Sequence, residues 1–391
     1  MHKKWDVIIV GAGPVGSYLA SRLAGCGLST LILEEHLDIG RPSCCSGIVG
    51  TSCLSSFPIP PRVILRETSS ATFYSPSGKT LRAATPNPVA FVVDRPMLDQ
   101  SLAEHAQELG AVLRLGMGVR GLKINGEGVT IQVGGNGHDD LHARAVVLST
   151  GFPSSLPEVA GLGLIARWGI GAQAEVPVNG LEETEVYLGQ GIAPGFFAWL
   201  VPTTPGKALA GVISSQTGPY LQALLKDLRQ RGKVKSQESQ ICFRRIAFSP
   251  RSRTYGARVL AVGEAAGQVK VTTGGGIFYG LVCAEEAAQT LKRAFGSGDL
   301  SSRSLAGYEK GWKSRLGTEF KVGAWARSLY GRLSDRRIDD IFARVQGSDI
   351  VPTVTGMDDF SFDWHSPAIA QALKHQALQG LRRLFPFRDT H

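Results

Sequence analysis

Three glycines near the N-terminus, followed by two acids, have the types and spacing that binding of a dinucleotide requires. The residues concerned are Gly11, Gly13, Pro14, Gly16, Glu34 and Glu35. The first glycine permits a tight turn, the second lets the backbone approach a pyrophosphate, and the third lets a helix pack closely on a strand. Glu34 would accept hydrogen bonds from the ribose of the adenosine half. The chemistry expected here is recognition of an adenine dinucleotide.

The elements on either side of these glycines fit that role. Val7 to Val10 is a continuous apolar run, as in a parallel strand that is buried on both faces. Ser17 to Gly25 has apolar residues at helical spacing, and Thr30 to Leu33 is a second apolar strand that ends at the two acids. The order strand, glycine turn, helix, strand and acid distinguishes a dinucleotide fold from an isolated glycine-rich turn.

Further glycine and acid motifs occur downstream. A predicted strand from Ala145 ends in Thr150-Gly151, and a strand from Arg258 to Val262 leads into an acidic turn. Next, three glycines open a helix that runs to about Phe295. Val93-Asp94-Arg95 precedes another helical stretch, from Leu98 to Ala106. These motifs contain Arg95, Gly151, Gly263, Glu264, Gly274, Gly275, Gly276 and Ile277.

This set of motifs resembles the flavoprotein hydroxylase superfamily, which implies that the dinucleotide is FAD. Glu264 stands where the superfamily's GDAAG motif has Asp, the residue that contacts the ribityl chain. The resemblance implies that Arg95 reaches the cofactor. It also implies that the helix beginning near Ile277 directs its N-terminus at the flavin, where the helix dipole would stabilise an anionic reduced flavin.

The predicted fold class is α/β, with a Rossmann-type FAD-binding domain, an inserted antiparallel β-sheet substrate domain and a helical C-terminal region. Residues 1–59, 94–152 and 251–299 would form the discontinuous FAD-binding domain. Residues 60–93, with a hairpin around Ser77-Gly78, and residues 153–250, with alternating polarity, would form the substrate domain. Residues 300–391 would form the helical region.

Two stretches resemble the geranylgeranyl reductase family, which saturates isoprenoid double bonds. One is the run from Gln268 to Gly280. The other is Phe197-Ala-Trp199-Leu-Val-Pro202 with Ala210-Gly211, which is similar to the family's YxWxFP and GxG substrate-pocket motifs but departs from them at Phe197, Val201 and Ala210. The resemblance and the apolar composition predict that a prenyl chain contacts Phe196, Phe197, Trp199, Pro202, Gly211 and Phe278.

The loop from Arg41 to Ile48 resembles the cysteine-containing loop that lies beside the flavin ring in this family, and Cys45 matches its cysteine better than Cys44 does. We predict hydride transfer from N5 of reduced FAD to one alkene carbon. Protonation of the other carbon would come from Cys45, Tyr279 or water. The electron donor would be NADPH or another reductant, and an electron-donor protein is an alternative, because no second GxGxxG unit is found.

Composition limits the other functions. The 391 residues are 43% hydrophobic and 19% charged, which is typical of a packed globular protein. The six cysteines have no zinc-ligand spacing, so no metal is expected. The net charge of +9 favours an acidic partner, but the flavin motifs leave no reason to expect nucleic acid. No stretch predicts a transmembrane helix, so the expected location is the cytoplasm.

The last predicted helix indicates a second location for the protein, at a membrane surface. It would begin at Ser366-Pro367, with apolar residues at Ile369, Leu373, Ala377, Leu381 and Leu384 and basic residues beside them. Such a helix could lie in a lipid headgroup layer, where a peripheral enzyme would meet a prenyl lipid. The alternative is a helix that packs on the protein's own core.

Three other functions share these motifs. A monooxygenase of the same fold, either a hydroxylase or an epoxidase, would consume oxygen as its product forms. A halogenase would need tryptophan where Phe197 stands. A non-catalytic flavin-binding component of a membrane complex would hold FAD that no donor reduces.

Overall fold

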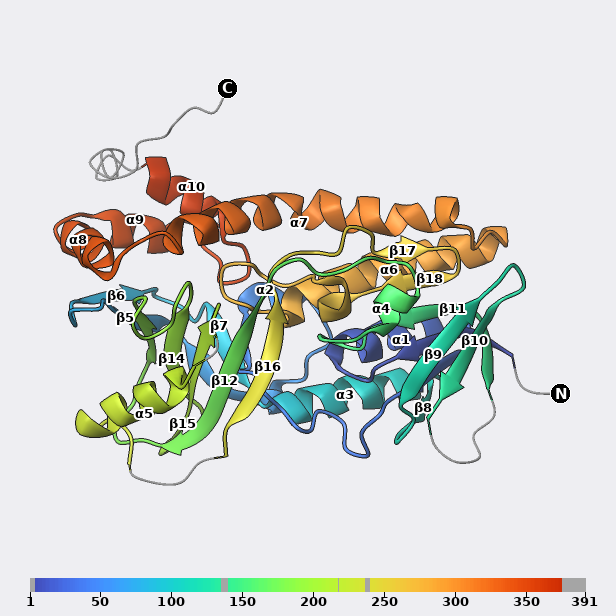
Figure 1. Cartoon of the computed structure of the whole chain (residues 1–391), viewed down its shortest axis with the longest axis horizontal. Coiled ribbons are helices and arrows are strands. Elements are labelled where there is room, and N and C mark those ends of the chain that lie inside the picture. The colour runs from blue at the N-terminus through green and yellow to red at the C-terminus, as the bar shows by residue number, and fades with distance from the viewer. Residues whose placement is uncertain (1–3, 135–139, 217, 236–239, 375–391) are drawn as a thin grey trace.

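A largely parallel sheet places the glycine turn at the carboxyl end of one of its central strands. The computed structural model (Figure 1) describes residues 4–134, 140–216, 218–235 and 240–374, and in it that strand is β1. The sheet has the order β17 (Tyr255–Gly256), β18 (Val259–Ala261), β11 (Leu141–Leu148), β1 (Trp5–Val10), β2 (Thr30–Leu33), β8 (Val112–Arg114), with β10 (Val129–Val133) and β9 (Val119–Ile124) attached to β11. β1 pairs in parallel with β2 on one side and β11 on the other. Its carboxyl end is therefore a switch point, where open α/β sheets bind ligands.

Helices cover this sheet and form the main core with it. They are α1 (Pro14–Ala24), α3 (Arg95–Glu108), α6 (Ile277–Ser297) and α7 (Ser302–Tyr330). Leu19, Leu98 and Leu281 are fully buried where the first three helices meet. α1 begins at Pro14 rather than at Ser17, because proline is well suited to the first helical position, which needs no amide hydrogen.

A second sheet of seven strands forms the other half of the molecule (Figure 1). Its order is β16 (Cys242–Ala247), β12 (Trp168–Pro177), β15 (Lys207–Ser214), β14 (Phe197–Pro202), β13 (Thr184–Leu188), β5 (Ser70–Tyr74), β6 (Thr80–Ala84). The expected hairpin is confirmed as β5–β6, and it joins the sheet through a parallel pair with β13. α5 (Tyr220–Gln230) packs its leucines on one face of this sheet.

A small three-stranded sheet lies at the junction of the predicted domains. β7 (Ala90–Val93) pairs with both β3 (Ile48–Gly50) and β4 (Ile64–Thr68). The strands of this sheet therefore come from residues 1–59 and from residues 60–93, which were predicted to belong to different domains. The domain boundaries stay a prediction. Two short helices also occur in the chain. α2 (Thr51–Ser56) directly follows β3, and α4 (Leu156–Val159) lies between β11 and β12.

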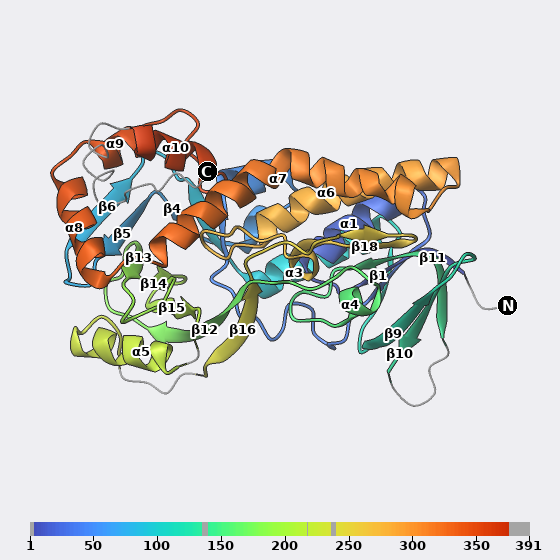
Figure 2. The same cartoon turned by 45° about the horizontal axis from the view of Figure 1, so that its top comes forward.

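The chain continues as helices over one side of both sheets (Figure 2). α7 lies along α6 and is followed by α8 (Asp335–Gln346), α9 (Ile350–Thr355) and α10 (Ser366–Lys374). α10 begins at the predicted Ser366, whereas the expected continuation to Leu384 lies outside the described residues. Among the helices of the described ranges, none combines the length and the apolar character needed to cross a bilayer.

Candidate active site

One cavity extends from the glycine turn to the second sheet. Its volume is about 1390 Å³, and its lining includes Gly11 and Gly13 at one end and Phe73 and Val186 at the other. The C-terminal segment contributes to the wall, through Phe362 and neighbouring residues. The cavity therefore joins the predicted dinucleotide site to a largely apolar chamber.

The three glycines of the turn have three different surroundings. Gly11 has φ +106°, and a Cβ there would lie 2.5 Å from the Ser149 carbonyl oxygen. At Gly16 a Cβ would lie 2.1 Å from the Gly11 carbonyl oxygen, so this glycine serves helix packing. Gly13 lines the cavity, and a Cβ there would meet nothing within 4 Å. Gly13 also caps α1 without a side-chain acceptor, which leaves amides of the first turn able to bind a pyrophosphate.

Glu34 lies at the end of β2 and holds the turn in place. One carboxylate oxygen accepts the Ala12 amide at 2.8 Å, and the other accepts the His36 amide at 3.0 Å. Glu34 and Glu35 both line the cavity, as does Pro14. The geometry is compatible with the predicted contact between Glu34 and a ribose.

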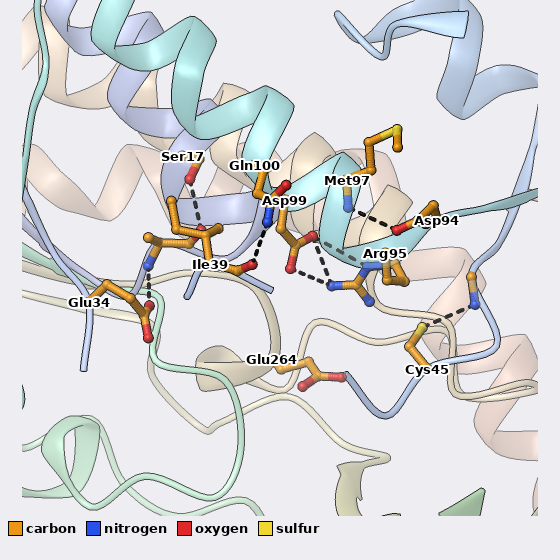
Figure 3. A network of polar contacts seen from close by, with 12 residues as sticks. Ser17, Glu34, Ile39, Cys45, Asp94, Arg95, Met97, Asp99, Gln100 and Glu264 are labelled. Atoms are coloured by element: carbon orange, nitrogen blue, oxygen red, sulfur yellow. Dashed lines mark hydrogen bonds and ion pairs between the residues drawn. The ribbon is translucent and has the colours of Figure 1, made fainter. Parts of the chain in front are cut away.

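Arg95 begins α3 and points into the cavity. Its guanidinium lies 3.1 Å from the carboxylate of Asp99, one helical turn away. Burial raises the pKa of Asp99, although Arg95 opposes that rise. In Figure 3 the Arg95 guanidinium, the Cys45 thiol and the Glu264 carboxylate lie around one region of the site.

Glu264 pairs with a residue that the sequence analysis missed. Arg244, from β16 of the second sheet, donates to its carboxylate at 2.6 Å. The Nε atom of Arg244 is buried and has no hydrogen-bond partner among the described residues. Arg244 also lies beside Gly151, where a Cβ would approach its guanidinium to 3.0 Å. A buried, unsatisfied donor on a cation fits an anionic or polyhydroxylated ligand. No local motif marks Arg244, since strand pairing brings it to the site.

The N-terminus of α6 faces the same cavity. The lining includes Gly274, Gly275, Gly276 and Ile277, together with Gly151 and Glu264. Gly276 caps the helix without a side-chain acceptor. Gly263 does not line the cavity. Its amide donates to the Gln268 side chain at 2.7 Å, so Gly263 contributes to the shape of the turn and not to the cavity wall. Taken together, these residues fit a flavin dinucleotide.

Cys45 lines the cavity in the loop after β2. Its sulfur accepts the Gly47 amide at 3.4 Å, and the Arg95 guanidinium lies near it in the same part of the cavity (Figure 3). Its carbonyl oxygen accepts the Gln173 side-chain amide at 3.2 Å. Cys45 therefore presents a thiol to the cavity, with an amide donor on its sulfur and a cation nearby.

The position of Tyr279 argues against its predicted role as a proton donor. Its side chain is fully buried, and its hydroxyl donates to Glu319 at 3.2 Å. Burial raises the pKa of Tyr279 further above its ordinary value. Among the described residues, the cavity lining includes its neighbour Phe278 but not Tyr279. The helical turn that points Phe278 into the cavity directs Tyr279 into the core.

The predicted substrate residues fall into two groups. Phe197, Trp199 and Phe278 line the cavity. Gly211 instead makes room for Trp199, because a Cβ at Gly211 would lie 2.2 Å from the indole ring. Phe196 and Pro202 lie outside the cavity lining, and Phe196 packs against Phe248 in a tilted arrangement with ring centroids 4.5 Å apart.

Lys270 is a second residue that sequence reasoning missed. It lines the cavity but is only 4% exposed, and its ammonium donates to the Phe362 carbonyl oxygen at 2.5 Å. Burial lowers the pKa of Lys270 to about 8. The one feature of the sequence that marks Lys270 is its charged side chain between Val269 and Val271.

Free thiols, rather than metal ligands, are the other chemical groups near the site. All six cysteines are free, and two of them, Cys44 and Cys45, line the cavity. Within the described ranges no group of three His, Cys, Asp or Glu residues is placed to hold a metal ion.

Comparisons with known proteins agree with this geometry. No family model matches the chain. It is 31% identical over 373 residues to digeranylgeranylglycerophospholipid reductase 2 of Methanothermobacter thermautotrophicus. This alignment covers 89% of this chain and 93% of the relative. A geranylgeranyl bacteriochlorophyll reductase-like protein of Thermoplasma acidophilum is 25% identical, with a TM-score of 0.84 over 98% of this chain and 100% of that one.

A more distant structure shows how widely the fold is shared. The p-nitrophenol 4-monooxygenase of Pseudomonas putida is 16% identical, with a TM-score of 0.70 over 91% of this chain and 97% of that one, and indicates the fold alone. The identity and coverage of the methanogen relative settle the family. The chain belongs to the geranylgeranyl reductase family of FAD-dependent oxidoreductases.

Proposed function

We propose that this enzyme reduces carbon-carbon double bonds of an isoprenoid chain carried on a prenyl lipid. The observation that carries the proposal is the single cavity, which has a dinucleotide-binding turn at one end and Phe73, Val186, Phe197 and Trp199 at the other. An apolar chamber that opens directly onto the cofactor site suits a long hydrocarbon whose reacting bond must lie against the flavin.

FAD is the proposed cofactor. Gly13 and the first turn of α1 would hold its pyrophosphate, Glu34 its adenosine ribose, and Glu264 with Arg244 its ribityl chain. Reduced FAD supplies the hydride when bound. NADPH or an electron-donor protein is the proposed source of its electrons.

Cys45 is the proposed proton donor to the second alkene carbon. It lines the cavity, the Gly47 amide donates to its sulfur, and the nearby Arg95 cation would offset the negative charge that remains after the proton has left. An apolar chamber that excludes water would keep this thiol as the nearest acid.

Delivery of the lipid from a membrane surface is the proposed route to the cavity. Ile369 of α10 lines the main cavity and also a smaller apolar groove of about 300 Å³ that includes Trp325 and Leu373. Trp325 and Leu373 are partly exposed, and no described residue of α10 is buried. α10 therefore lies between an apolar surface and the cavity, where a lipid chain could pass.

The reaction is tested by incubating the FAD-loaded enzyme with a chemical reductant and a prenyl lipid extract without oxygen, and then measuring lipid masses. Each reduced double bond adds two hydrogens, and we expect such products only with enzyme. Product that needs oxygen and contains an added oxygen atom would instead identify a monooxygenase. FAD that no donor reduces would favour a non-catalytic flavin protein.

Membrane delivery is tested with vesicles of anionic lipid. Leu373→Glu places a charge on the exposed apolar face and should weaken vesicle binding while leaving the bound flavin unchanged. Gln222→Glu, which adds the same charge at an exposed position of α5, is the matched control. Equal binding of both variants and the wild type would exclude α10 as the contact.

A further inference from the structure

The edge strand of the second sheet has exposed aromatic and basic side chains on its outer face. Residues of a strand point alternately to its two faces: Arg244 and Ile246 of β16 line the cavity, whereas Phe243 and Arg245 are exposed. Trp168 of the neighbouring strand β12 lies beside them, with the Arg245 guanidinium 4.8 Å from the centre of its ring. Phe243 is 63% exposed and Trp168 is 44% exposed. Large aromatic side chains that flank a cation in water are typical of an interaction surface.

This surface is strongly positive. Residues 241–258 include five arginines and no Asp or Glu. Arg167, which precedes Trp168, is also exposed, and its backbone amide donates to the Ser249 hydroxyl at 3.1 Å, so its loop lies against the same stretch. We call Arg167, Trp168, Phe243 and Arg245 the outer patch. Its charge is complementary to that of an acidic partner.

One strand separates the outer patch from the proposed cofactor site. Arg244, next to Arg245 in β16, donates to Glu264 at 2.6 Å, and Glu264 is proposed to hold the ribityl chain of FAD. A partner on the outer patch would lie behind this strand and could not touch the flavin. Hydride transfer needs contact between the reacting groups, whereas single electrons cross a thin layer of protein. The outer patch therefore suits a carrier of single electrons rather than a nicotinamide.

We propose that the outer patch docks an acidic electron-carrier protein that reduces the enzyme. The proposal rests on the proposed function, because it names the source of the electrons that lipid reduction consumes. Two carriers each lose one electron, and the bound FAD gains both electrons together with two protons from solvent. The arginines attract and orient the carrier, and the two aromatic rings supply apolar contact.

Other partners fit the outer patch less well. Two copies of this chain that met there would place like charges opposite each other, because a twofold contact brings the same surface of both copies together. A lipid surface is proposed to contact α10, and Figure 1 and Figure 2 both show β16 on the side of the molecule away from α10. DNA would match the charge, so it enters the test as a rival.

The first measurement is calorimetric titration of the FAD-loaded enzyme with an oxidised plant-type [2Fe–2S] ferredoxin, an acidic one-electron carrier. We expect saturable binding that weakens as salt rises from about 0.05 to 0.5 M. Arg245→Glu and Arg167→Glu should each raise the Kd by about fivefold or more, and either variant decides the test if the other folds poorly. Arg336→Glu, the same charge reversal at an exposed position of α8, is the matched control and should bind as the wild type does.

The second measurement is the rate at which reduced ferredoxin bleaches the flavin absorbance in the absence of lipid. The two outer-patch variants should be reduced more slowly than the wild type and Arg336→Glu, whereas dithionite, which needs no docking surface, should reduce all four proteins alike. Dithionite-reduced wild type that saturates no lipid would contradict the proposed function and leave ferredoxin binding unaffected, so the two failures are distinguishable.

Three results would overturn the proposal. One is ferredoxin that does not bind the wild type. Another is an equal Kd for Arg245→Glu, Arg167→Glu and Arg336→Glu. The third is a DNA duplex that binds more tightly than ferredoxin and loses affinity in the same two outer-patch variants, which would assign the surface to nucleic acid.

Discussion

Gly13 and Gly16 lie in the same turn, but the absence of a side chain leaves space for a ligand at Gly13 and allows close packing at Gly16. At Gly13 an added Cβ meets no protein atom within 4 Å, and the residue faces the cavity. Gly13→Ala should therefore leave the stability of the FAD-free protein unchanged and weaken FAD binding by about tenfold or more, which is 1.4 kcal/mol. FAD titration and thermal unfolding of the FAD-free protein measure the two effects.

Gly16→Ala is the matched comparison. Its Cβ would lie 2.1 Å from the Gly11 carbonyl oxygen, so we expect a loss of about 1–3 kcal/mol in unfolding free energy before any effect on the ligand is considered. If Gly13→Ala destabilises the FAD-free protein as much as Gly16→Ala does, the open space at Gly13 does not belong to a ligand.

Cys45 and Cys26 offer a second matched pair at the residue scale. Cys45→Ala should retain FAD but lower the rate of alkene reduction by about 100-fold or more, the typical contribution of a general acid. Cys26 is exposed at the end of the first helix, and Cys26→Ala should change turnover little. Single-turnover rates measure the effect, and near-wild-type rates in both variants would show that the Cys45 thiol has a structural role.

At the scale of elements, Asp363 fixes the C-terminal segment to the start of α2. One of its carboxylate oxygens accepts the Gly50 amide and the other accepts the Cys53 amide, each at 3.0 Å. Asp363→Ala should lower the unfolding free energy by about 1–3 kcal/mol, because two buried amides lose their acceptor. Hydrogen exchange should increase at both contact sites.

The control for this prediction is Asp359→Asn, an exposed change in the same segment. It should leave both stability and exchange as they are in the wild type. If exchange at Gly50 and Cys53 is unaffected in Asp363→Ala, the segment is held by its other contacts, such as those of Glu319 with the His365 and Ser366 amides.

The elements nearest to local motifs were the most predictable from sequence. The strand before Gly11, the hairpin around Gly78 and the helix after Gly276 follow from residue spacing within about 20 positions. By contrast, Arg244 meets Glu264 only because β16 pairs with β12, and Lys270 meets Phe362 only because the C-terminal segment returns to the cavity. Long-range pairings of this kind leave no periodic signal in a single sequence.

For the whole molecule, Lys270 links stability to pH. Its pKa is about 8 in the folded protein against an ordinary value of 10.5, so the unfolded chain binds more protons between these two values. The cost of burying the charge is fully present below pH 8, and it disappears as the pH rises to 10.5. The wild type should therefore gain unfolding free energy in this window, up to about 3 kcal/mol.

Lys270→Met removes the titrating group and should not show that gain. Denaturant unfolding of both proteins at several pH values between 7 and 10.5 measures the difference. Parallel curves for the two proteins across this window would mean that the Lys270 ammonium is not the source of the pH dependence.

The wall that the C-terminal segment gives to the cavity also has a consequence for biosynthesis. The residues proposed to bind the dinucleotide occur from Gly11 onward and are all present once α6 has been made, but Phe362 and Ile369 complete the wall much later. During translation the apolar face of the second sheet therefore stays open until these last residues leave the ribosome. A chain interrupted before Phe360 would carry an unclosed apolar surface, which is the kind of surface that chaperones retain and proteases remove.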